Sequence, residues 1–173
     1  MHSLILGGAR SGKSALAERW ATASGRQVTY IATARSGDEE MAARIAHHRA
    51  RRPSTWACVE APASLAATLL RHAGEDRCLL VDCLTLWLSN LLIDGEGAMF
   101  EREYDALLAT LPGLPGDILL VSNEVGCGIV PMGALSRRFV DEAGRLHQAL
   151  ARACDRVVFV AAGLPLALKG TLP

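Results

Sequence analysis

Residues 7–14, GGARSGKS, have the GxxxxGK[ST] spacing of a phosphate-binding loop. Glycines let such a loop fold closely around phosphate oxygens, and the amides at the start of the following helix donate hydrogen bonds to them. Lys13 can reach the outer phosphates, and the Ser14 hydroxyl can ligate Mg²⁺. The motif therefore predicts a nucleoside triphosphate site made of Gly7, Gly8, Ala9, Arg10, Ser11, Gly12, Lys13 and Ser14.

Asp82 is a second candidate for the same site. It follows the apolar run at 78–81, which is typical of a buried strand. An enzyme that uses this loop needs a carboxylate at the end of a neighbouring strand to hold the water shell of its metal ion. Aspartate is also a common helix N-cap, so a purely structural role stays open. We expect Ser14 and Asp82 to be the metal ligands.

A pair of histidines stands in the charged segment DEEMAARIAHHRARRP, residues 38–53. On a helix, His48 continues an apolar stripe with Ile45, whereas His47 shares a charged face with Arg51. A neutral imidazole among guanidinium groups suits nucleophilic attack on a phosphoryl centre. A histidine on a charged helix face is more often simply solvated, so the spacing leaves both roles of His47 open. His48 is expected to pack or to orient its neighbour.

Short apolar runs alternate with helical spacing along the chain. This order predicts an α/β fold of the P-loop NTPase type, with a mostly parallel sheet covered by helices on both faces. We expect one nucleotide-binding catalytic domain over residues 1–173, with a turn at 111–117 and a mobile surface loop at 94–99. The expected strands are 4–6, 28–32, 78–81, 118–121 and 157–161, and the expected helices are 15–24, 39–51, 65–72, 100–111 and 135–153.

The composition excludes some classes of function. The chain of 173 residues carries 18 basic and 18 acidic residues, so no basic nucleic-acid-binding surface is expected. Its five cysteines form no CxxC pair, and the sequence shows no signal-like N-terminus and no membrane-spanning apolar stretch. We therefore expect a cytoplasmic protein without a membrane span.

Taken together, the motifs resemble those of one enzyme family. They are GGARSGKS, YIAT, DEEMAARIAHHRARRP, TWACVEAP, LLVDCLTLWLSNLL, VSNEVGCGIVP, GRLHQALARACDRVVFVAAGLP and LKG, in order through nearly the whole chain. The series is similar to the bifunctional adenosylcobinamide kinase/adenosylcobinamide-phosphate guanylyltransferase family of the late cobalamin pathway. The resemblance implies that a nucleoside triphosphate, ATP or GTP, phosphorylates adenosylcobinamide. GMP then passes from GTP through a GMP-histidine intermediate to give adenosylcobinamide-GDP.

The resemblance also implies roles for individual residues. It makes His47 the nucleophile, in agreement with the helical-face argument, and Lys13 a group that spreads the charge on the phosphates. It further implies Mg²⁺ as cofactor and a homotrimer. For Glu60, a contact with the guanine edge and a plain surface acid stay equally open. The implied nucleotide contacts beyond the loop are Ala32, Thr33, Ala34, His48, Arg49, Ala50, Arg51, Glu60 and Asp82.

Other interpretations compete with this one. A monofunctional small-molecule kinase needs only the loop and Asp82, and a GTP-binding switch needs a guanine-reading NKxD-type element where this chain has SNEV. A non-catalytic relative would not need an intact loop. Asn123 and Glu124 are expected at a strand end, on the edge where open α/β sheets bind ligands, although the glycines after them also suit a simple turn. No residue is assigned to the corrinoid.

Overall fold

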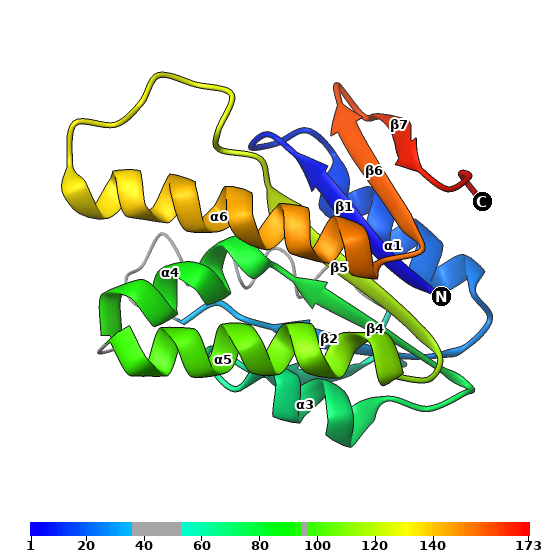
Figure 1. The fold of residues 1–173 in the computed structure, drawn as a ribbon. Helices are drawn as coiled ribbons and strands as arrows, with labels where there is room; N and C mark the ends of the chain where they lie inside the picture. The colour runs from blue at the N-terminus through cyan, green and yellow to red at the C-terminus, as the bar shows by residue number, and fades with distance from the viewer. Residues whose placement is uncertain (36–52, 95–96) are drawn as a thin grey trace.

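The computed structural model describes residues 1–35, 53–94 and 97–173. Within these ranges the strands form one seven-stranded sheet in the order β3-β2-β4-β5-β1-β6-β7 (Figure 1). Neighbouring strands are parallel except for β7, which runs antiparallel to β6. The strands are β1 (His2–Gly7), β2 (Gln27–Ala32), β3 (Ala57–Glu60), β4 (Arg77–Asp82), β5 (Asp117–Asn123), β6 (Arg156–Ala161) and β7 (Leu164–Lys169).

Helices cover both faces of the sheet, as the sequence predicts. Within the described residues, one face packs against α1 (Lys13–Ala23), and the other against a layer of four helices (Figure 1). Side chains of a strand alternate between faces, so Leu4 and Leu6 join the core of the four-helix layer while Ile5 joins the core beneath α1. The four helices are α3 (Leu65–His72), α4 (Leu84–Asp94), α5 (Gly97–Thr110) and α6 (Ala134–Ala153).

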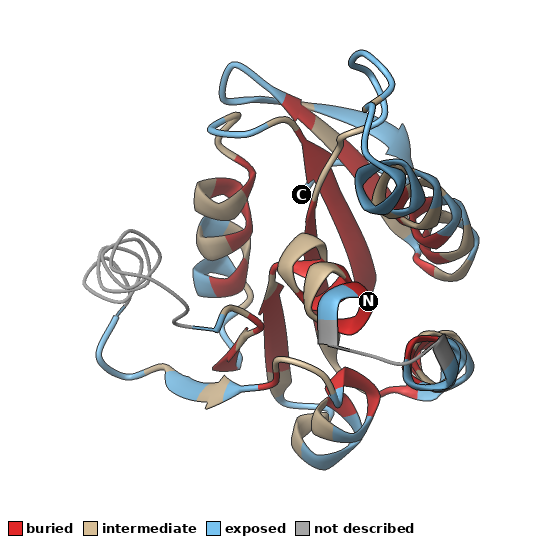
Figure 2. Cartoon of the chain, turned by 90° about the vertical axis from the view of Figure 1, so that its left-hand side faces the viewer, coloured by how far each residue is buried: buried red, intermediate tan, exposed pale blue. Residues whose placement is uncertain are grey.

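The central strands are the most deeply buried part of the sheet. Every residue of β1 is buried, whereas the edge strands β3 and β7 are largely exposed (Figure 2). A close-packed interior resists displacement, so the loops that leave β1, β4 and β5 start from fixed points. β1 leads into the predicted phosphate-binding loop and β4 ends at Asp82, whereas the predicted residues Ala32 and Glu60 end β2 and the exposed β3.

All five predicted strands are present, each one to three residues longer than predicted. Four of the five predicted helices are also present, and the fifth, at 39–51, lies outside the described residues. The turn before β5 is confirmed: a short 3₁₀ helix, Leu111–Gly113, leads to Gly116 at a φ of 81°. The predicted loop at 94–99 is wrong at both ends, because α4 extends to Asp94 and α5 begins at Gly97; residues 95–96 lie outside the described residues.

Three elements were not predicted. β3 is a short edge strand, and β7 contains Pro165, a residue that demotes a strand prediction. α4 is apolar on most of its sides and follows β4 with only Cys83 between them. Its buried face includes Trp87, Leu88 and Leu91, so it is a core helix without the polar stripe that would reveal it. None of the helices in the described ranges is long and apolar enough to cross a membrane.

Candidate active site

The phosphate-binding loop joins the end of β1 to the start of α1. A Cβ atom on Gly7 would lie 2.5 Å from the Val160 carbonyl oxygen and 2.6 Å from Ser11 Oγ, so a larger residue would clash there. Gly12 precedes the helix at a φ of 98°, a conformation that glycine adopts at low cost. The two glycines permit the tight turn that brings the loop over the N-terminus of α1, where backbone amides lack helical partners.

Lys13 is only 7% exposed, and its Nζ donates to the Gly8 carbonyl oxygen at 2.9 Å, across the loop. Burial lowers the pKa of Lys13, and Cys83 and Asp82 oppose this shift. Because burial raises the pKa of the Cys83 thiol to about 11, the Asp82 carboxylate is the charge that favours the ammonium at neutral pH. An ammonium has three protons to donate, so Lys13 keeps donor capacity for a phosphate oxygen.

Ser11 contributes a further donor to the loop. Its Oγ atom is buried and has no hydrogen-bond partner among the described residues. Its backbone is held at both sides: the amide donates to the Gly8 oxygen at 3.3 Å, and the carbonyl accepts from the Gly163 amide at 2.8 Å. Buried hydroxyls in proteins nearly always have a partner, so an unpaired one in this loop fits a bound phosphate oxygen.

The carboxyl ends of the parallel strands bring other predicted residues to the same edge of the sheet. Ala32 at the end of β2 pairs with both Glu60 of β3 and Asp82 of β4. Gly7 pairs with Asn123 of β5. Ligands bind at this edge in open parallel sheets because the loops and helix N-termini gather there. Their shared position agrees with the predicted site, while the role of each residue stays a prediction.

Thr33 differs from its neighbours. Its side chain is fully buried, and the hydroxyl donates to the Cys83 carbonyl oxygen at 2.7 Å and accepts from the Cys83 amide at 2.9 Å. Asn90 Nδ2 donates to the Thr33 carbonyl oxygen at 2.8 Å. The Thr33 side chain therefore holds the ends of β2 and β4 together, whereas Ala32 and Ala34 are half-buried.

A comparison with protein families decides the identity of this site. Residues 3–168 match the profile of the family described as cobinamide kinase/cobinamide phosphate guanyltransferase. The chain belongs to this family. It is accordingly a bifunctional kinase and guanylyltransferase of adenosylcobalamin biosynthesis. This finding favours the bifunctional enzyme over the monofunctional kinase that the sequence also allowed.

Individual relatives match over almost their full length. The chain is 62% identical over 170 residues to the bifunctional adenosylcobalamin biosynthesis protein CobP of Pseudomonas aeruginosa, covering 98% of each chain. It is 41% identical over 182 residues to CobU of Salmonella typhimurium, covering 98% of this chain and 100% of that one. A solved structure from Pyrococcus horikoshii OT3 shares the fold, with a TM-score of 0.57 at 8% identity over 99% of this chain and 87% of that one.

The histidine segment of the family motif is not part of the described ranges. His47, His48, Arg49, Ala50 and Arg51 all fall between residues 35 and 53. Their predicted roles in this guanylyltransferase rest on the helical-face argument and on the resemblance, and they stay predictions.

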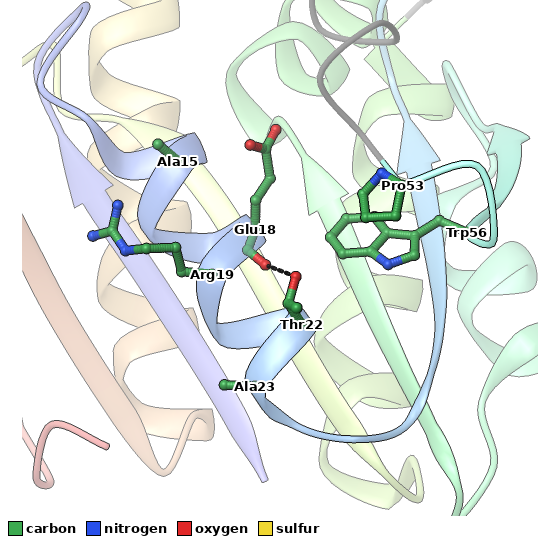
Figure 3. Close-up of a pocket in the computed structure, with 7 residues that line it drawn as sticks. All are labelled: Ala15, Glu18, Arg19, Thr22, Ala23, Pro53 and Trp56. Carbon is green, nitrogen blue, oxygen red and sulfur yellow. Dashed lines mark hydrogen bonds between the residues drawn. The ribbon is translucent and has the colours of Figure 1, made fainter.

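A cleft beside the phosphate-binding loop was not predicted from the sequence (Figure 3). It has a volume of about 410 Å³, and its wall on α1 starts at Ala15, directly after Ser14. The Trp56 ring and Pro53 form the opposite wall. Trp56 directly precedes β3, a strand that was not predicted, so nothing in the sequence indicated that its ring would line a cleft. The cleft is lined by Ala15, Glu18, Arg19, Thr22, Ala23, Pro53 and Trp56.

A buried polar network between α6 and the end of β5 was also not predicted from the sequence. His147 on α6 lies within 2.8 Å of Ser122 Oγ on β5, measured from Nε2. In the sequence, His147 stands at helical spacing with Ala143, Leu146 and Leu150, so it looks like one more core position. The one sequence signal was that His147 is a polar residue within an apolar stripe, a position where a buried side chain needs a hydrogen-bond partner.

Proposed function

We propose that this enzyme phosphorylates the aminopropanol hydroxyl of adenosylcobinamide and then transfers GMP from GTP onto the new phosphate, which gives adenosylcobinamide-GDP. The observation that carries this proposal is the complete phosphate-binding loop in a member of the cobinamide kinase family. Within that loop, Lys13 and Ser11 both keep donor capacity. We further propose that the loop takes either ATP or GTP, since its contacts address phosphates and not the base.

The kinase step needs donors that hold the transferred phosphoryl group. Lys13 and the amides at the start of α1 would bind the outer phosphate oxygens and balance the negative charge that develops on them. The corrinoid hydroxyl oxygen attacks the γ-phosphorus, the bond to the β-phosphate oxygen breaks, and the hydroxyl proton leaves to solvent or a nearby base. Little covalent chemistry is asked of the protein, so positioning dominates.

Mg²⁺ fits the residues of this loop. Two observations support this: Ser14 lies in the first turn of α1, and Asp82 ends β4, where its charge opposes the lowering of the Lys13 pKa by burial. A hydroxyl and a carboxylate, together with phosphate oxygens and water, make the oxygen set that Mg²⁺ takes. We propose Ser14 and Asp82 as its protein ligands. When bound, the ion neutralises charge on the phosphate oxygens.

For guanylyl transfer we propose His47 as the nucleophile. An imidazole nitrogen of His47 forms a bond to the α-phosphorus of GTP, and the bond to pyrophosphate breaks. A phosphate oxygen of the corrinoid then attacks the same phosphorus, and the phosphorus–nitrogen bond breaks. His48 would orient the ring, and Arg49 and Arg51 would balance the charge. Glu60, at the end of β3, would accept hydrogen bonds from the guanine edge.

We also propose that the enzyme is a homotrimer in the cytoplasm. Exposed apolar side chains after β5 support self-association, because Ile129 is 98% exposed and Met132 is 95% exposed. None of the five cysteines, all of which lie in the described ranges, takes part in a disulfide, which is typical of a reducing compartment. The balanced charge gives no support for a nucleic-acid partner.

The two reactions can be tested separately. Purified enzyme is incubated with adenosylcobinamide, Mg²⁺ and triphosphate labelled at the γ-phosphate, first ATP and then GTP. The proposal expects label on the corrinoid from both donors, and a further shift of the corrinoid mass by one GMP only when GTP is present. Adenosylcobinamide phosphate as the final product with GTP would refute the guanylyltransferase assignment, and no label transfer would refute the kinase assignment.

A further inference from the structure

His147 is a buried histidine near the phosphate-binding loop, without a role in the chemistry proposed above. It is 7% exposed and lies on the face of α6 that packs onto the sheet. Burial lowers the pKa of His147, and the nearby Glu124 carboxylate opposes this shift. The ring is therefore neutral at pH 7, with one nitrogen that donates and one that accepts.

The two ring nitrogens face two residues of the same β5 segment. Nε2 lies 2.8 Å from Ser122 Oγ, and Nδ1 lies 3.4 Å from Glu124 Oε2. Nδ1 has no hydrogen-bond partner within the described residues, so its contact with Glu124 is electrostatic, between the N–H dipole of a neutral ring and the carboxylate. A carboxylate only accepts, so the proton belongs on Nδ1, and Nε2 accepts from the Ser122 hydroxyl. His147 thus bridges two residues that stand two positions apart in the chain.

The hydroxyl side of the network extends to α4. Thr85 Oγ1 lies 3.4 Å from Ser122 Oγ and accepts a hydrogen bond from the Asn123 amide at 2.7 Å. With the Ser122 proton directed at His147, the Thr85 hydroxyl donates to Ser122 Oγ. One directed chain of polar contacts therefore runs from α4 through the end of β5 to α6. It holds the backbone of Asn123 from one side.

The carboxylate side of the network reaches the phosphate-binding loop. Glu124 Oε1 accepts from the Gly126 amide at 2.7 Å, which keeps the carboxylate beside His147. The Glu124 amide donates to the Gly7 carbonyl oxygen at 3.0 Å. Gly7 is the first residue of the loop and has no room for a side chain. Besides the pairing of β1 with β5 and β6, the Glu124 amide is therefore a direct contact between this network and the start of the loop.

We propose that His147 is a positioning residue for the nucleotide site: by bridging Ser122 and Glu124 it fixes the end of β5 against Gly7 and so holds the phosphate-binding loop in its binding conformation. This inference rests on the proposed function, since the loop must bind a nucleoside triphosphate. His147 itself does not touch the substrate. Its loss should act on nucleotide affinity more than on overall stability, because a small displacement of a preformed site is costly.

The chain offers a matched control at the opposite edge of the sheet. His2 is also 7% exposed, and its Nε2 lies 3.0 Å from the Leu114 carbonyl oxygen, at the amino ends of the parallel strands. His2→Leu and His147→Leu each remove a buried polar contact of one imidazole. Only His147→Leu removes a contact that leads to the loop.

The experiment measures the affinity of the full-length enzyme for a fluorescent GTP analogue, together with KM for GTP, kcat and Tm. His147→Leu should weaken binding and raise KM by about tenfold, and His147→Gln, which can still reach Ser122, should recover part of the loss. His2→Leu should leave both constants within about twofold of wild type at a similar loss of Tm. Wild-type affinity in His147→Leu, or an equal loss of affinity in both leucine variants, would overturn the proposal.

A second measurement covers the case in which His147→Leu does not fold. His147→Gln and Glu124→Gln are then combined, because each breaks the same contact. The proposal expects the fold-loss of affinity in the double variant to be smaller than the two single fold-losses multiplied together. A fold-loss equal to that product would show that the two residues act independently and would overturn the proposal. Wild-type enzyme that binds no GTP analogue at all would instead refute the proposed function, so the two failures are distinct.

Discussion

The carboxyl ends of the parallel strands form one edge of the sheet, the carboxyl edge, and their amino ends form the opposite amino edge. Lys13 lies at the carboxyl edge and Lys169 at the amino edge, and both direct an ammonium at main-chain carbonyl groups. Within the described residues, Lys13 donates one hydrogen bond, to Gly8. Lys169 donates three, to the last carbonyls of α6 and the residue after it, at 2.6 to 3.1 Å. The second lysine uses its donors to cap a helix, whereas the first keeps donors for a ligand. The same side chain is structural at one edge and functional at the other.

Other residue types repeat this contrast. At the amino edge, Asp117 binds Arg26 Nε at 2.7 Å and the Met1 ammonium at 3.1 Å. At the carboxyl edge, burial lowers the pKa of Lys13 and the charge of Asp82 partly opposes this shift. The acidic side chain at the amino edge is thus used up in ion pairs, whereas Asp82 and Lys13 lie at the edge that carries the predicted site.

The two lysines give the largest expected difference. Lys13→Met should lower kcat/KM of both reactions by about 10²–10³-fold with little change in Tm, since it removes a preorganised cation. Lys169→Met should lower the free energy of unfolding by about 1 kcal/mol and leave kcat/KM unchanged. Steady-state kinetics and thermal unfolding of both variants check this. An activity loss in folded Lys169→Met as large as that in Lys13→Met would break the comparison.

The two aspartates come next. Asp82→Asn should lower kcat/KM by about 10–100-fold and raise the Mg²⁺ concentration needed for half-maximal rate, because the metal loses a charged ligand. Asp117→Asn should cost about 1–2 kcal/mol of unfolding free energy through its lost charged hydrogen bonds, at unchanged Mg²⁺ dependence. Magnesium titrations and denaturant unfolding measure both. An unchanged titration in Asp82→Asn would remove it from the metal site.

Two glycines give an intermediate effect. A Cβ on Gly7 would meet Val160 and Ser11 atoms, and a Cβ on Gly116 would lie 2.2 Å from the Gly74 carbonyl oxygen, at a φ of 81°. Gly7→Ala should raise KM for GTP by about tenfold by displacing the loop. Gly116→Ala should lower stability by about 1–3 kcal/mol and leave KM unchanged. Kinetics at a temperature where both variants are folded would sharpen the comparison, and a larger KM change in Gly116→Ala would contradict it.

Two serines give the smallest effect. Ser24 Oγ at the end of α1 donates to the Ala21 carbonyl oxygen at 2.7 Å, whereas Ser11 Oγ is buried without a described partner. Ser11→Ala should raise KM for nucleotide about 2–10-fold at unchanged Tm, since a hydrogen bond to ligand is lost. Ser24→Ala should cost about 0.5–1.5 kcal/mol in stability alone. The reverse pattern in kinetics and melting would show that Ser11 has no ligand role.

The sequence predicts more of the carboxyl edge than of the elements behind it. Gly7, Lys13 and Asp82 are visible because phosphate chemistry demands them at fixed spacing after short apolar runs. β7 was missed because Pro165 and its exposure disguise an edge strand, and α4 because a buried helix has no polar stripe. His147 was missed because helical spacing alone places it with apolar residues, and its partners on β5 are distant in the chain.

The most direct test of the account is covalent labelling with GTP that carries label at the α-phosphate. Wild-type enzyme with Mg²⁺ should acquire acid-labile, alkali-stable label, as expected of a bond from phosphorus to a histidine nitrogen. His47→Ala should acquire none, His48→Ala should retain some, and Lys13→Met should label far more slowly. Equal labelling of His47→Ala, or no label on a wild-type enzyme that still hydrolyses GTP, would contradict the account.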